Sequence, residues 1–213
     1  MQNLSHQRVL SLIKLRKLSQ IAAMASTRHI SRTMPSRRGD RGFTLIELLV
    51  TMAVAVVLVT IAVPSFRNIT LSNRLTTAAN DIVGAVYSAR TEAVKLNAAT
   101  QLCSNSTSNN TSDTLGTACA SQTGAVYALT GSTATQIRAS AVGIAMPLQL
   151  NGDMVALRFT SAGLGQQVGT TTPFSNTVVD ICTSSLSSNN HRVITMTTGS
   201  IITTTTTSGA CPG

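Results

Sequence analysis

The longest apolar segment of the chain runs from Phe43 to Val63 and contains a single charged residue, Glu47. About 20 apolar residues in a helix are enough to cross the hydrocarbon core of a bilayer. The pattern therefore predicts a transmembrane segment over residues 43–63. A carboxylate inside such a segment costs roughly 2.5–3.5 kcal/mol on insertion scales, so we expect Glu47 to have a partner that offsets this cost.

Apolar residues continue beyond this segment at helical spacing. They are Ile69, Leu75, Ala79, Ile82, Val86, Ala89 and Ala93. Most charged residues lie off this stripe, so the pattern predicts an amphipathic continuation of one helix over residues 43–97. Pro64 lacks a backbone N–H, and we expect it to kink or loosen the helix near Thr60.

From residue 98 the composition changes to Ser, Thr, Asn and Gly with short β-prone segments. The predicted strands are Thr100–Ser104, Ala125–Thr130, Gln136–Gly143, Met154–Thr160, Thr177–Thr183, Arg192–Thr197 and Ile201–Thr206. Turn signals such as Asn151-Gly152 separate them. The expected fold class is α+β, a long N-terminal helix packed on an antiparallel β head of residues 98–213. The run Thr203–Thr207 predicts an edge strand with a solvated face, with O-glycosylation as the alternative.

The formal net charge of +9 would suggest a nucleic-acid binder, but the charge is concentrated before the apolar segment. Residues 1–42 hold nine Lys and Arg against one Asp, which gives +8, and the remainder holds seven basic against six acidic residues, which gives +1. A basic segment before an apolar helix places the N-terminus in the cytoplasm and exports the rest.

All four cysteines, Cys103, Cys119, Cys182 and Cys211, follow the predicted helix. They would lie in an exported compartment, where disulfides persist. Three connectivities are open to four cysteines. Adjacent pairing is favoured, because it would clamp the loop after the first strand and tie down the C-terminus. No Cys-x-x-Cys spacing is present, and no metal or cofactor is expected.

The motif Gly42-Phe43-Thr44-Leu45-Ile46-Glu47 stands between the basic segment and the apolar helix. It resembles the processing site of type IV pilins and of the pseudopilins of type II secretion. The resemblance implies that a prepilin peptidase cleaves between Gly42 and Phe43, which removes residues 1–42 as a leader, and then N-methylates Phe43. Leaders of this family are usually short and basic, so we expect the true start to be Met34. The resemblance also implies that Glu47 pairs with the Phe43 ammonium of a neighbouring subunit during filament assembly, which would supply the required partner.

Two alternatives to this interpretation remain open. Thr44 and Glu47 also fit a capping box, in which Glu47 would satisfy backbone donors at a helix start, and this role is compatible with pairing. A cleaved secretory signal would need a small-residue site, and Ala53-Val54-Ala55 is the candidate. That triplet lies inside the apolar segment instead of at its end.

The segments Ser88–Asn97, Val178–Cys182 and Arg192–Met196 narrow the resemblance to the GspH/FimT branch of minor pilins and pseudopilins. The resemblance implies a structural subunit of a type II secretion pseudopilus or a type IV pilus, and not an enzyme. Its implied partners are the prepilin peptidase, other pilin or pseudopilin subunits, the inner-membrane assembly platform and membrane lipid. Its implied location is the bacterial inner membrane, with a single pass and a periplasmic head, and afterwards the filament.

No group of residues in the sequence indicates a catalytic site. His191 is the single histidine after residue 42, and we interpret it as a solvated side chain. Asp113, Asp153 and Asp180 lie among Asn, Gly and Ser, where Asp ordinarily serves turns.

A DNA-binding minor pilin, acting as a receptor in natural transformation, is the competing hypothesis. Some members of the resembling branch bind DNA through an arginine in a C-terminal turn. The matching segment here, Thr198–Ile202, contains no arginine. Phosphate contacts require Lys or Arg, so nucleic acid is not an expected partner.

Overall fold

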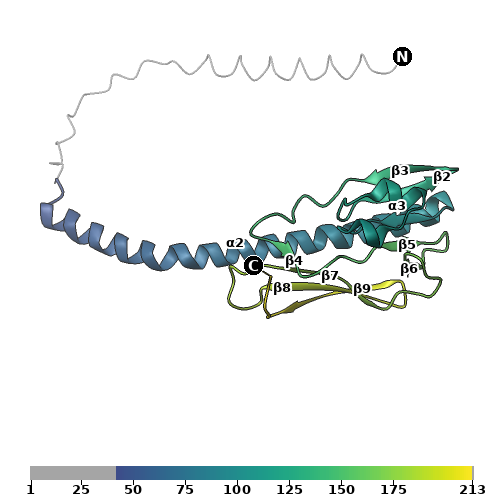
Figure 1. The fold of residues 1–213 in the computed structure, drawn as a ribbon. Helices are drawn as coiled ribbons and strands as arrows, with labels where there is room; N and C mark the ends of the chain where they lie inside the picture. The colour runs from purple at the N-terminus through teal and green to yellow at the C-terminus, as the bar shows by residue number, and fades with distance from the viewer. Residues whose placement is uncertain (1–41, 213) are drawn as a thin grey trace, which may run out of the picture. The chain divides into compact units, whose positions relative to one another are not determined.

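The structure is a computed structural model that describes residues 42–212 (Figure 1). The expectations for the leader, including a start at Met34, lie outside the described residues. The described residues fall into two units, which divide between Leu49 and Val50.

The first described element is helix α2, Leu45–Leu96, which has 52 residues. The Thr44 hydroxyl accepts a hydrogen bond from the Glu47 backbone N–H at 3.3 Å and so caps the helix start. The helix continues through Pro64 without a break in its assignment, and a kink near Thr60 stays a prediction. Asn97 has a positive φ of 48°, a conformation typical of the residue that ends a helix.

Helix α2 buries only the later part of its predicted stripe. Its buried residues are Leu75, Ala78, Ala79, Ile82, Ala85, Val86, Ala89 and Ala93. Ile69, which the stripe included, is 57% exposed. The head covers the helix only from about Leu71 onward, a limit that periodicity cannot reveal.

One antiparallel sheet has five strands in the order β3-β2-β1-β5-β6. Its strands are β1 (Thr100–Leu102), β2 (Val126–Thr130), β3 (Thr133–Arg138), β5 (Leu157–Phe159) and β6 (Gly165–Gln167). Between β1 and β2 the chain forms a 3-10 turn, η1 (Thr107–Asn110), and a short helix, α3 (Thr114–Cys119). The sequence did not predict either element, because Ser, Thr and Asn dominate this stretch and favour turns.

A second antiparallel sheet has four strands in the order β4-β7-β8-β9. Its strands are β4 (Gln149–Leu150), β7 (Asn176–Cys182), β8 (His191–Thr197) and β9 (Ile201–Thr207). Strand β9 is at the edge, and the Thr203–Thr207 side chains are exposed, as the sequence predicted. The predicted strand Gln136–Gly143 was wrong beyond Arg138, and the short edge strands β4 and β6 were not predicted.

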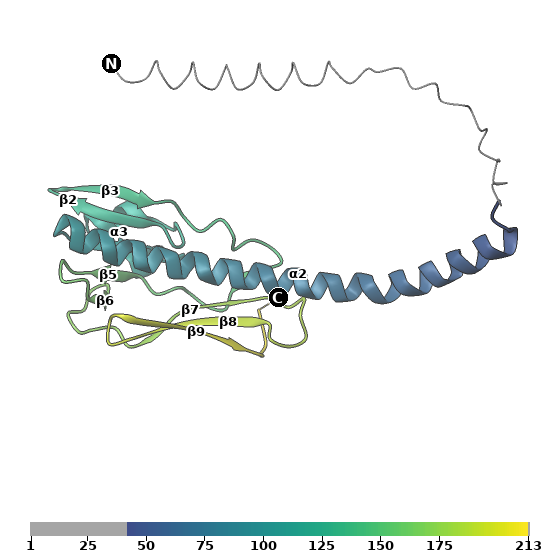
Figure 2. The same ribbon diagram turned by 180° about the vertical axis from the view of Figure 1, so that it is seen from behind.

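Both sheets lie along the C-terminal stretch of α2 (Figures 1 and 2). One apolar core joins them to the helix. It contains the buried residues of α2 together with Leu102, Val126, Leu157, Phe159, Ile181, Ile194 and Met196, among others. The expected α+β class is therefore confirmed, with the β head formed by two sheets.

Candidate functional site

The residues of the predicted cleavage site lie immediately before α2. Phe43 is 83% exposed, and Gly42 is exposed as well. A Cβ atom built on Gly42 would meet no other group within 4 Å. The subunit itself therefore imposes no steric requirement for glycine at this position, and any such requirement must come from a molecule that binds there.

Glu47 lies in the first turn of α2, where a negative charge is favoured by the helix dipole. Its backbone N–H is used by the Thr44 cap, but this bond does not involve the carboxylate. The carboxylate has no ion pair with any residue in the range 42–212. The Thr44 half of a capping box is thus present, and the charge of Glu47 remains available to an external partner.

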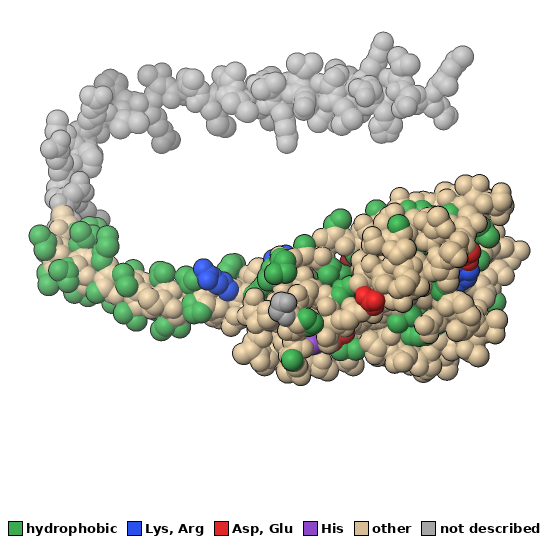
Figure 3. All heavy atoms as spheres, viewed as in Figure 1, with side chains coloured by type: hydrophobic (Ala, Val, Ile, Leu, Met, Phe, Trp, Pro, Cys, Tyr) green, Lys and Arg blue, Asp and Glu red, His purple; other side chains and the backbone are tan. Residues whose placement is uncertain are grey.

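The N-terminal stretch of α2 exposes an almost continuous apolar surface, visible as the green side chains along the helix in Figure 3. Within the described residues, α2 is the one helix long and apolar enough to cross a membrane, and none of its most apolar window is buried. Such a surface is far larger than the apolar patches that soluble monomers expose. It requires cover from lipid or from other protein.

The four cysteines form two disulfides in the head, Cys103–Cys119 and Cys182–Cys211. This is the adjacent pairing that the sequence favoured. The first bond packs with Ala125 in a small separate cluster. Next to it, the buried Asn110 side chain accepts a hydrogen bond from the Ser104 N–H at 2.8 Å and donates one to the Ala120 carbonyl at 2.7 Å. The loop from β1 to β2 is therefore held at several points.

His191 is only 3% exposed, so its interpretation as a solvated side chain was wrong. It begins strand β8, and its Nδ1 lies 2.8 Å from Oδ2 of Asp180 on the neighbouring strand β7. Asp180 also accepts a hydrogen bond from Asn151 at 2.9 Å. These residues form a structural polar pair between strands, a role that depends on strand register and that sequence position alone cannot show.

Asp113 is the N-cap of α3, and its carboxylate accepts a hydrogen bond from the Gly116 N–H at 2.9 Å. The same carboxylate forms an ion pair with Arg158 at 2.6 Å. The hydrogen bond from Arg158 is the main cause that lowers the pKa of Asp113 to about 2. Asp153 accepts a hydrogen bond from Asn105 at 3.0 Å. None of the described His, Cys, Asp and Glu residues gather into a cluster that could hold a metal ion.

Arg192 is 7% exposed and packs against α2. Its guanidinium donates hydrogen bonds to the hydroxyls of Ser72, at 3.0 Å, and Thr76, at 3.3 Å. Burial lowers its pKa. Arg192 is therefore not available to a phosphate backbone. The sequence analysis did not predict these contacts, although Ser72 and Thr76 are four residues apart and so share one helix face.

The turn between β8 and β9 is held by backbone hydrogen bonds to neighbouring segments. Thr198 and Gly199 both have positive φ values, 52° and 66°, as a tight hairpin turn requires. The Gly199 N–H donates to the Phe174 carbonyl at 2.7 Å, and its carbonyl accepts from the Gly165 N–H at 2.7 Å. This turn is used for packing against the β6 region.

An apolar helix that begins with a processing motif and ends in a disulfide-bonded β head defines a membrane-anchored, pilin-like protein. A family model for the prokaryotic N-terminal methylation motif matches residues 37–63, and a model for the type II transport protein GspH matches residues 78–200. The second match spans more than half of the chain, and the chain belongs to the GspH family. Comparison with curated proteins gave no match, and comparison with solved structures also gave none.

Family membership confirms the class that the motif indicated. The protein is a pseudopilin or minor pilin subunit, and this family is structural, not enzymatic. The pilin-type motif implies processing by a prepilin peptidase and assembly with other pilin subunits.

Proposed function

We propose that the chain is a subunit of the type II secretion pseudopilus that waits in the bacterial inner membrane before assembly. Residues 1–42 form the cytoplasmic leader, residues 43–97 the helix with its membrane segment 43–63, and residues 98–213 the periplasmic head. The basic leader supports this orientation, and the disulfides support an exported head. The family match to a type II transport protein favours this machine over a type IV pilus.

The prepilin peptidase cleaves between Gly42 and Phe43 in this proposal and methylates the new Phe43 amine. The exposed Phe43 and the open space around Gly42 support access of an enzyme to this bond. A side chain at position 42 would not disturb the subunit, so its cost would fall on cleavage.

The carboxylate of Glu47 carries the proposal. It is a charge on an apolar helix with no ion-pair partner among the described residues. Pairing with the Phe43 ammonium of a neighbouring subunit would neutralise both charges in an apolar filament core, where unpaired charges are costly. The inner-membrane assembly platform would deliver the subunit to the filament. There the remaining apolar surface of α2 would pack against other subunits.

The effect of the Glu47 charge can be tested separately from the effect of Glu47 on the start of the helix. Glu47→Gln keeps a residue that can serve a capping box but removes the charge. We expect normal insertion and processing with at least tenfold less incorporation into filaments, in line with the roughly 2.5–3.5 kcal/mol that a charge in an apolar segment costs. Incorporation is measured by immunoblotting of sheared or overproduced filaments.

Thr44→Ala is the matched control, because it removes the cap hydroxyl and keeps the charge. It should lower helix stability by about 1 kcal/mol and leave incorporation near normal. If the Gln variant is incorporated as well as the parent chain, the pairing proposal is wrong.

A further inference from the structure

Two arginines of the described chain differ from the other cations by having no partner. Five of the seven basic residues after Gly42 are held by the protein: Arg90 by the Ser200 carbonyl, Lys95 by Glu92, Arg138 by Asp81, Arg158 by Asp113, and Arg192 by hydroxyl and carbonyl groups. Arg67 and Arg74 have no hydrogen bond or ion pair within residues 42–212. Both side chains are exposed.

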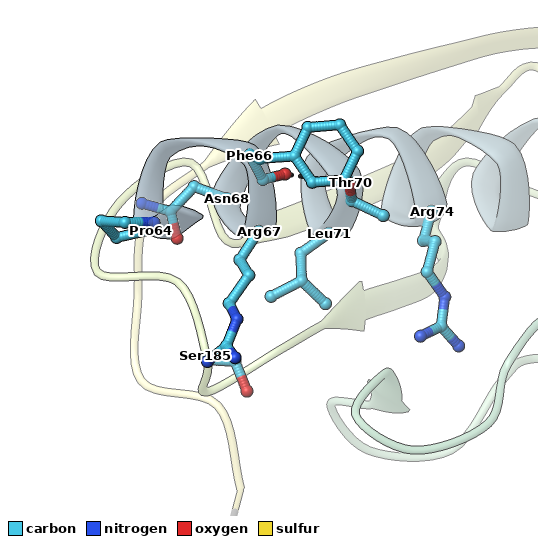
Figure 4. Close-up of a pocket in the computed structure, with 8 residues that line it drawn as sticks. All are labelled: Pro64, Phe66, Arg67, Asn68, Thr70, Leu71, Arg74 and Ser185. Carbon is cyan, nitrogen blue, oxygen red and sulfur yellow. Dashed lines mark hydrogen bonds between the residues drawn. The ribbon is translucent and has the colours of Figure 1, made fainter. Parts of the chain in front are cut away.

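These two arginines line one pocket with a volume of about 560 Å³. They are seven residues apart, which places them within about 20° of each other around a helix. Figure 4 shows Arg67, Leu71 and Arg74 on the same side of α2, with Ser185 at the end of Arg67. Leu71 lies between the two arginines, and Pro64 and Phe66 are the other apolar residues that line the pocket, with the Phe66 ring directed away from Leu71 (Figure 4).

The pocket lies at the height of a lipid headgroup if α2 crosses the membrane as proposed above. Arg67 follows the end of the apolar segment at Val63 by four residues, a rise of about 6 Å, and Arg74 follows it by about 16 Å. The headgroup layer extends roughly 5–8 Å beyond the hydrocarbon core on each side. Arg67 therefore falls within this layer, and Arg74 lies about 10 Å further along the same side of α2.

The chemistry of the pocket matches an anion with apolar chains. No carboxylate lines it, and a guanidinium binds phosphate oxygens through two parallel N–H donors. Pro64 lies at the end of the pocket nearest the membrane segment, where acyl chains would run. A soluble anion would not use this end of the pocket.

We propose that Arg67 binds the phosphate of an anionic phospholipid headgroup, with Arg74 supplying a second positive charge on the same side of α2 and the acyl chains running along the membrane segment beside Pro64. The site rests on the membrane insertion of the proposed function. It would hold the subunit at a fixed depth before assembly and release the lipid when the subunit leaves the membrane.

The test uses the processed full-length chain in detergent micelles and native mass spectrometry of bound lipid. The probes are phosphatidylglycerol and phosphatidylcholine with identical acyl chains. We expect the parent chain to prefer phosphatidylglycerol, and each of Arg67→Gln and Arg74→Gln to weaken this binding about fivefold. The double variant should lose the preference, and binding of phosphatidylcholine should change little.

Lys95→Gln is the matched control, because it removes one exposed cation from the other end of α2. It should leave the lipid preference unchanged. The proposal is overturned if the double variant and the Lys95 variant behave alike, or if inorganic phosphate alone displaces the lipid at an equal concentration. It is also overturned if a photo-crosslinker at Asn68, another pocket residue, captures a second protein subunit in membranes instead of lipid.

Carbonate extraction of membranes separates failure of this inference from failure of the proposed function. A chain that remains in the membrane but shows no lipid preference refutes the headgroup site alone. A chain that is extracted refutes both.

Discussion

Two stretches of helix α2, Leu45–Val63 and Leu75–Ala93, have equal length and are both rich in apolar residues. The first is exposed throughout, whereas the second buries eight side chains in the head. They differ in the distribution of apolar residues around the helix. The first stretch carries Leu, Ile and Val on all of its faces and therefore needs cover on every side. The second has one apolar stripe, which the same chain can cover.

Residue size also separates the two stretches. Five of the eight buried residues in the second are alanines. Small side chains let a sheet approach the helix backbone closely, and the Thr100 hydroxyl donates to the Ala89 carbonyl at 2.8 Å. The comparison teaches that the first stretch is built for partners outside the chain and the second for partners within it.

The largest expected effect is on processing at the N-terminal end of α2 and leaves the head unchanged. Gly42→Val should leave almost all of the chain as uncut precursor, because a branched side chain would obstruct access of the peptidase to the scissile peptide bond. The head should unfold at the same denaturant concentration as in the parent chain, since a Cβ at this position contacts nothing. Intact mass spectrometry checks the first result, and a mature species beginning at Phe43 would contradict it.

Removal of a disulfide should affect the stability of the head alone. In the chain-entropy model the separations of 16 and 29 residues correspond to about 3 kcal/mol for Cys103–Cys119 and about 3.6 kcal/mol for Cys182–Cys211. Paired Cys→Ser variants should lose this much free energy of unfolding while processing continues normally. Denaturant unfolding of the full chain in detergent provides the measurement. A loss below about 1 kcal/mol would show that the loops are held by their hydrogen bonds instead.

The direct test of the comparison introduces the same change into both stretches. Ala89→Leu should destabilise the head by about 1–3 kcal/mol, because Ala89 is fully buried and a larger side chain must displace its neighbours. Ala55→Leu, on the exposed stretch, should leave the head unchanged. Equal effects on the unfolding midpoint would mean that burial does not distinguish the two stretches.

The smallest expected effect concerns an ion pair of the head. The pKa of Asp113 is lowered to about 2 in the folded chain, mainly by Arg158, so its contribution is complete above a pH of about 4. As the pH falls from about 4 to about 2, the carboxylate gains a proton and the contribution is lost. Its size is modest, since the Asp113 side chain is 47% exposed.

Asp113→Asn should therefore lower the stability slightly at neutral pH and flatten its decline over this range. Asp153→Asn, which removes a carboxylate that faces Asn105, is the control. An unchanged pH profile for the Asp113 variant would show that the ion pair does not contribute.

Much of the fold follows from local features of the sequence. The length of the apolar segment, the β-prone composition of the strands β1, β2, β7, β8 and β9 and the composition change near residue 98 depend on neighbouring residues. The short strands β4 and β6 and the helix α3 lack such a local signal. They form because adjacent strands, the Cys103–Cys119 bond and the buried Asn110 hold them in place.

The candidate site divides in the same way. The sequence by itself determined the motif from Gly42 to Glu47 and the charge held on an apolar helix, because a processing site and a membrane segment are contiguous. Only the tertiary structure decided that His191 and Arg192 are buried and that Arg67 and Arg74 are left without partners. Burial and pairing depend on which segments, distant in the sequence, come into contact. Those contacts are determined by the register of β7 and β8 and by the point where the head begins to cover α2.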